Sequence, residues 1–147
     1  LNRFASAQNL WSLLDRRVEQ EGIPACAEFG LGMLPYFPLA SGLLTGKYQR
    51  GEPPPQGTRL EAWGERGAAA LSDANFDVVD KLAAFAEARG HTLLELAMSW
   101  LACQPTVSSV IAGATSPEQV AANAAAGQWQ LTDDELAEAG EAAGGRG

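Results

Sequence analysis

The sequence predicts an α/β fold in which short parallel strands alternate with helices. Three apolar runs of strand length lie at Phe4–Ala7, Met33–Phe37 and Val107–Ala112. Each run indicates a strand that is buried on both faces. Helical segments separate the runs, and this alternation favours parallel pairing with right-handed crossovers. With 147 residues, 46% of them hydrophobic, the chain has the size and composition of one compact unit.

Two helical segments are expected between the first and second strands. They lie at Trp11–Gln20 and Pro24–Phe29, with a break at Gly22 between them. Gly30 and Gly32 follow the second segment, where glycine ends a helix in a left-handed turn.

Two further helices are expected between the second and third strands, at Phe76–Arg89 and Leu93–Cys103. Gly90 is the stop signal of the first. Thr92 and Glu95 have the spacing of a capping box at the start of the second.

The end of the chain predicts two more helices and a tail. Ser116 precedes a proline and an acidic residue, which indicates a helix from there to about Ala126. Thr132 and three acidic residues open a last short helix. We expect residues 1–141 to form the folded unit and residues 142–147 a disordered tail.

A long connection rich in glycine and proline covers residues 42–75. Loops of this length in compact domains are usually functional or disordered. Three parallel strands cannot close a barrel and leave two apolar edges unpaired. The sequence therefore predicts that the chain is part of a larger structure.

The charge balance limits the classes of partner. A net charge of −8 and a pI near 4.5 argue against binding to nucleic acid or to anionic membranes. No apolar run reaches membrane-spanning length and no signal peptide is evident, so a cytoplasmic location is expected. His91 is the sole histidine, and no metal site is predicted.

Three strings carry a family resemblance. They are QNLWSLL at 8–14, YFPLASGLLTGKY at 36–48 and VIAGATSPEQ at 110–119. In this order and at these separations they resemble the last three strands of the aldo-keto reductase (β/α)₈ barrel, particularly its bacterial and potassium-channel-β-subunit-like branch. The resemblance implies a partial TIM barrel of the last three βα units. It also implies a site for NADP(H) at the carboxyl ends of the strands, with 42–75 as a cofactor loop.

Gln8 and Tyr36, each expected at the end of a strand, would hold the nicotinamide. An amide that both donates and accepts hydrogen bonds suits a carboxamide, and the matching glutamine in similar proteins makes this contact. The aromatic residue matching Tyr36 stacks on the nicotinamide ring. The alternatives are that Gln8 only orders a strand end and that Tyr36 belongs to the core.

The pyrophosphate would lie on the start of the long loop. Backbone amides near Leu39, Ser41 and Leu43 and the serine hydroxyl could cradle it, and Lys47 and Arg59 could add positive charge. The alternative for both cations is a solvated surface position.

The segment before the helix at Ser116 is the third expected contact, because a helix N-terminus favours an anion. Family members place the adenosine 2′-phosphate there, and residues matching Ser116, Gln119 and Asn123 touch phosphate, ribose or adenine. Gly113 stands where many reductases carry a lysine, and Ala122 where many carry a glutamate. Ser116 and Asn123 could also be an ordinary cap and a surface amide.

The residues expected to bind the cofactor come from the three strings, from the loop 42–75 and from the segment just after the third string. They are Gln8, Tyr36, Pro38, Leu39, Ser41, Gly42, Leu43, Lys47, Arg59, Gly113, Thr115, Ser116, Gln119 and Asn123.

No catalytic residue is expected in this chain. The family's tyrosine proton donor, with its lysine, aspartate and histidine, lies on earlier strands that would precede Leu1, and neither His91 nor Tyr48 has the partners that general acid catalysis requires. Two hypotheses follow. The chain is a fragment of an NADP(H)-dependent carbonyl reductase, which reduces a small carbonyl substrate only as a complete barrel, or it is a binding module that self-associates through its strand edges.

Overall fold

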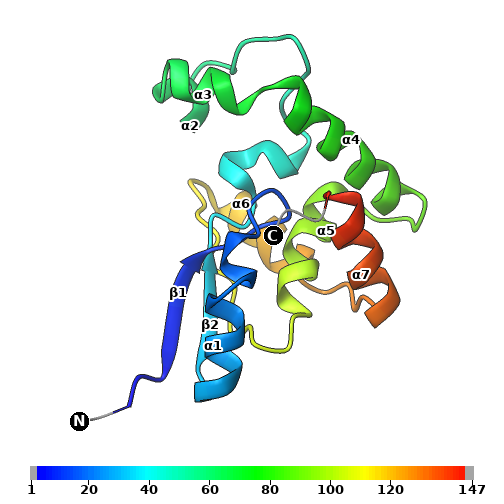
Figure 1. Ribbon diagram of the computed structural model, residues 1–147. Helices are drawn as coiled ribbons and strands as arrows, with labels where there is room; N and C mark the ends of the chain where they lie inside the picture. The colour runs from blue at the N-terminus through cyan, green and yellow to red at the C-terminus, as the bar shows by residue number, and fades with distance from the viewer. Residues whose placement is uncertain (1–2, 145–147) are drawn as a thin grey trace.

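The fold is α/β, as the sequence predicts, but its sheet contains only two strands. In the computed structural model, which describes residues 3–144, β1 (Ser6–Leu10) pairs in parallel with β2 (Gly32–Tyr36). The helices and 3₁₀ helices are η1 (Arg17–Glu19), α1 (Gly22–Phe29), η2 (Ala40–Thr45), α2 (Arg59–Ala62), α3 (Glu65–Ala70), α4 (Asp73–Glu87), α5 (Leu93–Ala102), α6 (Pro117–Ala126) and α7 (Asp133–Ala142). Both strands point toward the part of the molecule that contains α2, α3 and the start of α4 (Figure 1).

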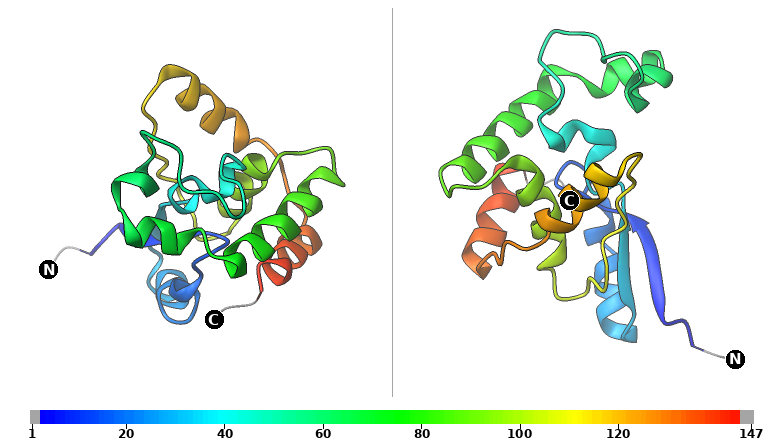
Figure 2. Two further views of the ribbon diagram at one scale, coloured as in Figure 1. Left: turned by 90° about the horizontal axis from the view of Figure 1, so that it is seen from above. Right: turned by 180° about the vertical axis from the view of Figure 1, so that it is seen from behind.

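The first strand begins later than its apolar run suggested. Phe4 is 85% exposed, and β1 starts at Ser6 and continues through Gln8 and Asn9, whose side chains are also exposed. Expecting this strand to be buried on both faces was therefore wrong. β1 lies at the outer edge of the molecule with β2 on one side only (Figure 2).

The segment Trp11–Gln20 is not a helix, in contrast to the expectation from its pattern. Ser12 and Asp15 form an antiparallel bridge, and the Ser12 hydroxyl accepts hydrogen bonds from the amides of Leu14 and Asp15. This side chain offers the backbone a turn in place of a helix. Trp11, Ser12 and Leu13 are each 2% exposed, so the burial of three consecutive residues prevails over helical periodicity.

Gly22 had been expected to break a helix, but it is the first residue of α1. A Cβ atom at Gly22 would lie 2.5 Å from Val18 Cγ2, so glycine is needed here for close packing of the preceding turn. The C-terminus of α1 agrees with the prediction, because Gly30 has φ 65° and its amide donates to the Cys26 carbonyl.

The third predicted strand forms only two isolated parallel bridges to β2, Met33 with Val107 and Tyr36 with Ile111. The Met33 amide donates to the Thr106 carbonyl, and the Ser108 amide donates back to the Met33 carbonyl. Pro35, the next residue of β2 on this side, has no N–H to continue the ladder. The next hydrogen bond to β2 comes from Ile111, whose amide donates to the Pro35 carbonyl.

The long connection 42–75 is also more ordered than expected. It contains most of η2, all of α2 and α3, and the first turn of α4. Thr58 and Ser72 cap α2 and α4 by accepting hydrogen bonds from the amides of Glu61 and Asn75.

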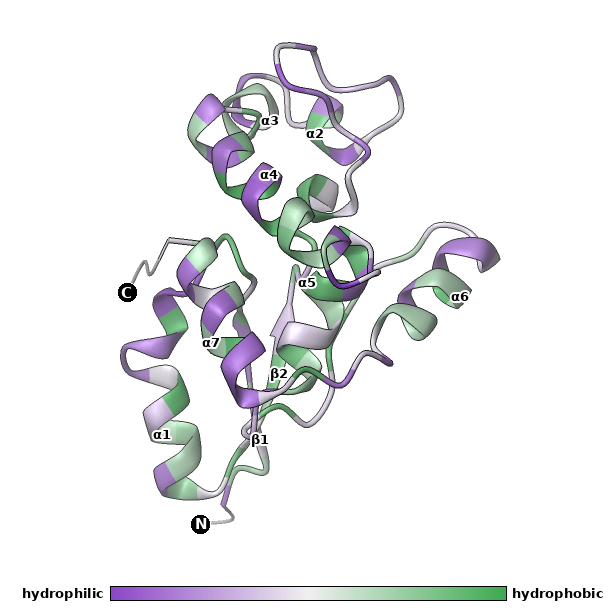
Figure 3. Ribbon diagram, turned by 90° about the vertical axis from the view of Figure 1, so that its right-hand side faces the viewer, coloured by the Kyte–Doolittle hydropathy of each residue, from purple (hydrophilic) through white to green (hydrophobic). Residues whose placement is uncertain are grey.

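The hydrophobic core centres on α5, which packs between α4, α6 and the 3₁₀ helix η2 (Figure 3). Trp100 on α5 meets Trp11 edge to face at 5.7 Å, and its indole N–H donates to the Leu136 carbonyl of α7. The buried Ser99 hydroxyl donates to the Ala126 carbonyl at 2.8 Å, which connects α5 to the end of α6. These contacts fix α6 relative to the sheet.

The C-terminal boundary differs from the expected one. Ala142 belongs to α7 and Ala143 is 4% exposed, so the folded part extends beyond residue 141. The rest of the expected tail, residues 145–147, lies outside the described residues. Over residues 3–144, no helix is both long and apolar enough to span a bilayer.

Candidate functional site

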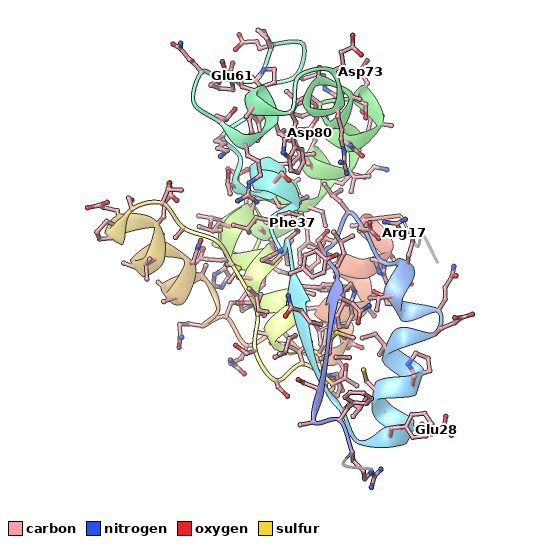
Figure 4. All side chains as sticks on the ribbon, turned by 90° about the vertical axis from the view of Figure 1, so that its left-hand side faces the viewer. Arg17, Glu28, Phe37, Glu61, Asp73 and Asp80 are labelled. Carbon is pink, nitrogen blue, oxygen red and sulfur yellow. The ribbon has the colours of Figure 1, made fainter. Side chains whose placement is uncertain are left out.

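A cavity of about 670 Å³ opens at the carboxyl end of β2. Three segments that are distant in sequence form its wall: the end of β2 with the start of η2, residues 56–59 before and at the start of α2, and residues 111–123 from the end of the third extended segment into α6. Figure 4 shows Phe37, the residue after β2, at the junction between the sheet and the part of the molecule that carries Glu61 and Asp73. The volume lies in the range of about 300 to 1,000 Å³ that is typical of small-molecule and cofactor sites.

The cavity wall is cationic although the chain is acidic. Lys47 and Arg59 line it, and no Asp or Glu of the described residues does. Within residues 3–144 neither cation forms an ion pair, whereas Arg16, Arg17, Arg50 and Arg89 do. An anion entering this cavity would therefore meet two positive charges that are not already neutralised by carboxylates.

Each of these cations packs against an aromatic ring and beside a glycine. Lys47 Nζ lies 5.1 Å from the centre of the Tyr48 ring, and Arg59 Cζ lies 5.3 Å from the centre of the Phe37 ring. A Cβ atom at Gly42 would lie 2.7 Å from Lys47 Nζ, and one at Gly113 would lie 3.7 Å from an Arg59 guanidinium nitrogen. Gly42 thus leaves space for Lys47, whereas a Cβ atom at Gly113 would only be in van der Waals contact with Arg59.

The backbone that follows β2 is strained where it forms the wall. Phe37, Ala40 and Ser41 have φ values of 56°, 46° and 60°, a region that non-glycine residues rarely occupy. Hydrogen bonds hold this conformation: the Tyr48 hydroxyl donates to the Ser41 carbonyl, and the Thr45 hydroxyl donates to the Gly42 carbonyl. Such strain persists only where the surroundings enforce it, and it clusters at ligand sites.

The start of α6 is capped by its own side chains. The Ser116 hydroxyl accepts from the Gln119 amide at 3.3 Å, and Gln119 Oε1 accepts from the Thr115 amide at 2.9 Å. Hydrogen bonds from the Ser116 hydroxyl and from the Glu118 amide lower the pKa of the Glu118 carboxyl. A carboxylate therefore already lies at this helix N-terminus. The amides of Gly113 and Ala114 donate to no acceptor among the described residues.

The structure brings together most of the residues expected at the site. Eleven of them line the cavity: Tyr36, Pro38, Leu39, Ser41, Gly42, Lys47, Arg59, Gly113, Thr115, Gln119 and Asn123. They come from the second and third strings and from the loop between these strings, except for Asn123, which follows the third string by four residues.

Three expected residues do not line the cavity. Gln8 lies in the middle of β1, because the strand continues to Leu10, and it pairs with Leu34. Its side chain is on the same face of the sheet as Tyr36, but two residues further from the carboxyl end of the strands. Leu43 points into the core and is 2% exposed. Ser116 directs its hydroxyl into its own helix turn.

Other lining residues were not expected from the sequence. Gln56, Gly57 and Thr58 lie in the long loop, whose length was the only signal for them, whereas Phe37 follows Tyr36 in the second string. Leu94, on the first turn of α5, carried no signal, because its position follows from how α5 packs. The rest are Thr45, Ile111, Ala112, Ala114 and Ala122.

Comparisons with known proteins identify the family of the chain. The family model for the aldo/keto reductase family matches residues 2–143. A probable voltage-gated potassium channel subunit beta from Oryza sativa subsp. japonica is 40% identical over 108 residues, which cover 73% of this chain and 33% of that protein. The L-glyceraldehyde 3-phosphate reductase of Escherichia coli O157:H7 is 34% identical over 135 residues, which cover 89% of this chain and 39% of that enzyme.

The NADH-specific methylglyoxal reductase of Escherichia coli K12 is 34% identical over 129 residues, which cover 86% of this chain and 38% of the enzyme. The chain thus spans between 33% and 39% of the length of these three relatives. Since the family match extends over nearly all of its residues, the chain belongs to the aldo/keto reductase family.

Proposed function

We propose that the chain is the NADP(H)-binding C-terminal part of an aldo/keto reductase-type oxidoreductase, formed from the last three βα units of a (β/α)₈ barrel. One observation carries the proposal. The cavity at the end of β2 combines in a single wall the Tyr36 ring, two cations that have no carboxylate partner within residues 3–144, and Thr115 and Gln119 around the start of α6.

The residues fit the parts of a dinucleotide in order along the cavity. Tyr36, at the strand end, offers a flat ring to the nicotinamide. Lys47 and the η2 backbone would hold the pyrophosphate, because a cation beside closely spaced amides suits an anion. Thr115, Gln119 and Asn123 would meet the adenosine.

Arg59 favours NADP(H) over NAD(H) within this proposal. Family membership leaves the choice open, since one relative is named as NADH-specific. Gly113 offers no charge, but the Arg59 guanidinium lies beside it, and Gly113 is two residues before Thr115 in the chain. A guanidinium binds a phosphate through paired hydrogen bonds, so Arg59 would serve the 2′-phosphate.

The bound cofactor would supply the hydride, and the complete barrel would supply the proton donor and most of the substrate pocket. Two relatives are named for reductions of L-glyceraldehyde 3-phosphate and of methylglyoxal. We therefore propose a small carbonyl compound as the substrate class. The role of this chain is to bind and orient the dinucleotide.

A titration of intrinsic fluorescence with NADPH tests the proposal. Trp63 is 37% exposed and its ring lies 6.3 Å from that of Phe37, so a ligand in the cavity should change its emission. Tyr36→Ala should weaken NADPH binding about tenfold through loss of the stacking ring, and Tyr36→Phe should leave it unchanged. Equal affinity of wild type and Tyr36→Ala would contradict this assignment.

A second candidate function is a non-catalytic module that assembles with copies of itself. The outer edge of β1 favours it, because that edge has no neighbouring strand among the described residues and the nearby Phe4 and Phe29 are 85% and 54% exposed.

A further inference from the structure

Residues 49–58 form a strap that passes over one side of the cavity and supplies Gln56, Gly57 and Thr58 to its wall. The strap is fixed at each end by a buried side chain, Tyr48 at 6% exposure and Leu60 at 0%. Between these anchors no residue is buried. Apolar packing therefore does little to hold the strap in place.

Hydrogen bonds within the strap are local, with one exception. The Glu52 amide donates to the Gln49 carbonyl, the Thr58 amide donates to the Pro55 carbonyl, and the Gly57 amide donates to a carboxylate oxygen of Glu61. In the described part of the chain, the hydrogen bonds that connect the strap to a distant element all come from Arg50.

Arg50 contacts three carboxylates on α4. Its guanidinium donates to Asp77 and Asp80 at 2.8 Å each and to Asp73 at 3.4 Å, and it lies over the Phe76 ring at 5.6 Å. Figure 4 shows Asp73 and Asp80 on α4, in the same part of the molecule as Glu61. Without Arg50, three like charges would face one another along one side of α4, which is unfavourable.

We propose that Arg50 is a positioning residue whose ion pairs with Asp77 and Asp80 tether the strap over the cavity and so slow the release of a bound dinucleotide. The proposal rests on the proposed function for the identity of the ligand. The tether itself does not, because it is present without any ligand.

The tether should be sensitive to salt. The Arg50 side chain is 39% exposed and its aspartate partners are more exposed, so mobile ions can reach every charge of the cluster. Exposed pairs are individually weak and screened within about 10 Å at 0.1 M salt. Cavity access should therefore rise with ionic strength while the core stays folded.

The first test uses the chain without ligand. Subtilisin, a protease of broad specificity, should cleave within residues 49–58 about fivefold faster in Arg50→Gln than in wild type, with the cleavage site identified by mass spectrometry. Addition of 0.5 M NaCl should raise the wild-type rate toward that of the variant. Lys81→Gln is the matched control. It removes one positive charge from α4 at an exposed side chain that forms no ion pair within residues 3–144, and it should change neither rate.

A cycle with Asp77→Asn and Asp80→Asn separates the tether from a general charge effect. The double aspartate variant should match Arg50→Gln, and adding Arg50→Gln to it should bring no further increase. Unchanged cleavage in Arg50→Gln, or fully additive effects, would overturn the proposal.

The second test measures NADPH dissociation by stopped-flow fluorescence. Arg50→Gln should raise the dissociation rate about fivefold, and Arg50→Lys less, because lysine keeps the charge but loses the forked geometry. Faster cleavage with unchanged dissociation would mean that the strap does not retain the ligand, which also overturns the proposal. If wild type binds no NADPH, the proposed function fails, and the cleavage rates still decide whether Arg50 holds the strap.

Discussion

The two cations of the cavity each lie beside a glycine. Lys47 lies against Gly42 and Arg59 lies beside Gly113. Gly42 also has φ 96°, so a side chain there would be unfavourable for both contact and backbone conformation. In the absence of carboxylates along the wall, the two cations retain their charge for a ligand.

Arg59 should discriminate between phosphorylated and unphosphorylated adenosine. We expect Arg59→Gln to weaken binding of 2′,5′-ADP about tenfold and of ADP less than about twofold, because loss of a charged hydrogen bond affects only the ligand that has the 2′-phosphate. Isothermal titration calorimetry of both nucleotides measures the ratio. Lys47→Gln serves as the comparison, since it should weaken both nucleotides alike. An equal loss for both ligands in Arg59→Gln would place Arg59 at the pyrophosphate.

The helices are defined chiefly by their N-termini. In α5 and α7 the hydroxyls of Thr92 and Thr132 each accept a hydrogen bond from the amide three residues on. The carboxylates of Glu95 and Glu135 in turn accept hydrogen bonds from the amides of these two threonines. The hydrogen bond from the Thr92 amide, followed by that from its hydroxyl, lowers the pKa of Glu95. The Thr132 amide likewise lowers the pKa of Glu135.

These lowered pKa values predict how stability changes in acid. Because the folded pKa of each glutamate lies below its ordinary value of 4.5, its contribution to stability is complete above pH 4.5 and is lost as the pH falls through the folded value. Urea unfolding at pH 7 and pH 3 should show a smaller loss of stability in Glu95→Gln and Glu135→Gln than in wild type. Thr92→Ala should lower the free energy of unfolding by about 1 kcal/mol at pH 7. A pH dependence in both glutamine variants equal to that of wild type would show that the caps are not formed in solution.

The molecule as a whole has one well-packed side and one open side. α4, α5 and α7 enclose the core, whereas β1 presents an unpaired edge next to Phe4 and Phe29. Sheet edges of this kind tend to acquire another strand, either from the remainder of a barrel or from a second copy.

The open edge should control association. If copies assemble through it, analytical ultracentrifugation of the chain should show a concentration-dependent increase in mass, and Phe29→Ser should reduce it. Val120→Ser, at a residue of α6 that is 59% exposed, is the matched control and should have no effect. A monomer at all concentrations, or an equal effect of both variants, would exclude β1 as the contact.

Local signals in the sequence predicted the helices well and the strands less well. The caps of α5, α6 and α7 were readable because a side chain and an amide three residues apart decide them. The cap of α4 was missed, since this helix starts at Asp73 after Ser72 and not at Phe76. The turn at Ser12–Asp15 could not be predicted, since the apolar spacing of this segment also suits a helix. Only the packing of Trp11 and Leu13 distinguishes the turn from a helix. The third strand is interrupted because Pro35 has no N–H to continue the hydrogen-bond ladder. This interruption could be predicted only by knowing that the segment from Val107 to Ile111 lies beside β2.

The sequence by itself determined the α/β class, the starts of α5, α6 and α7, and eleven of the residues that line the cavity, because each follows from residue types at short spacing or from three recognisable strings. Only the tertiary structure decided that Arg59 lies beside Gly113, that Gln8 and Leu43 turn away from the cavity, and that Arg50 reaches α4. These are contacts between segments far apart along the chain. Their formation depends on how the helices pack, and packing depends on the shape of the whole core.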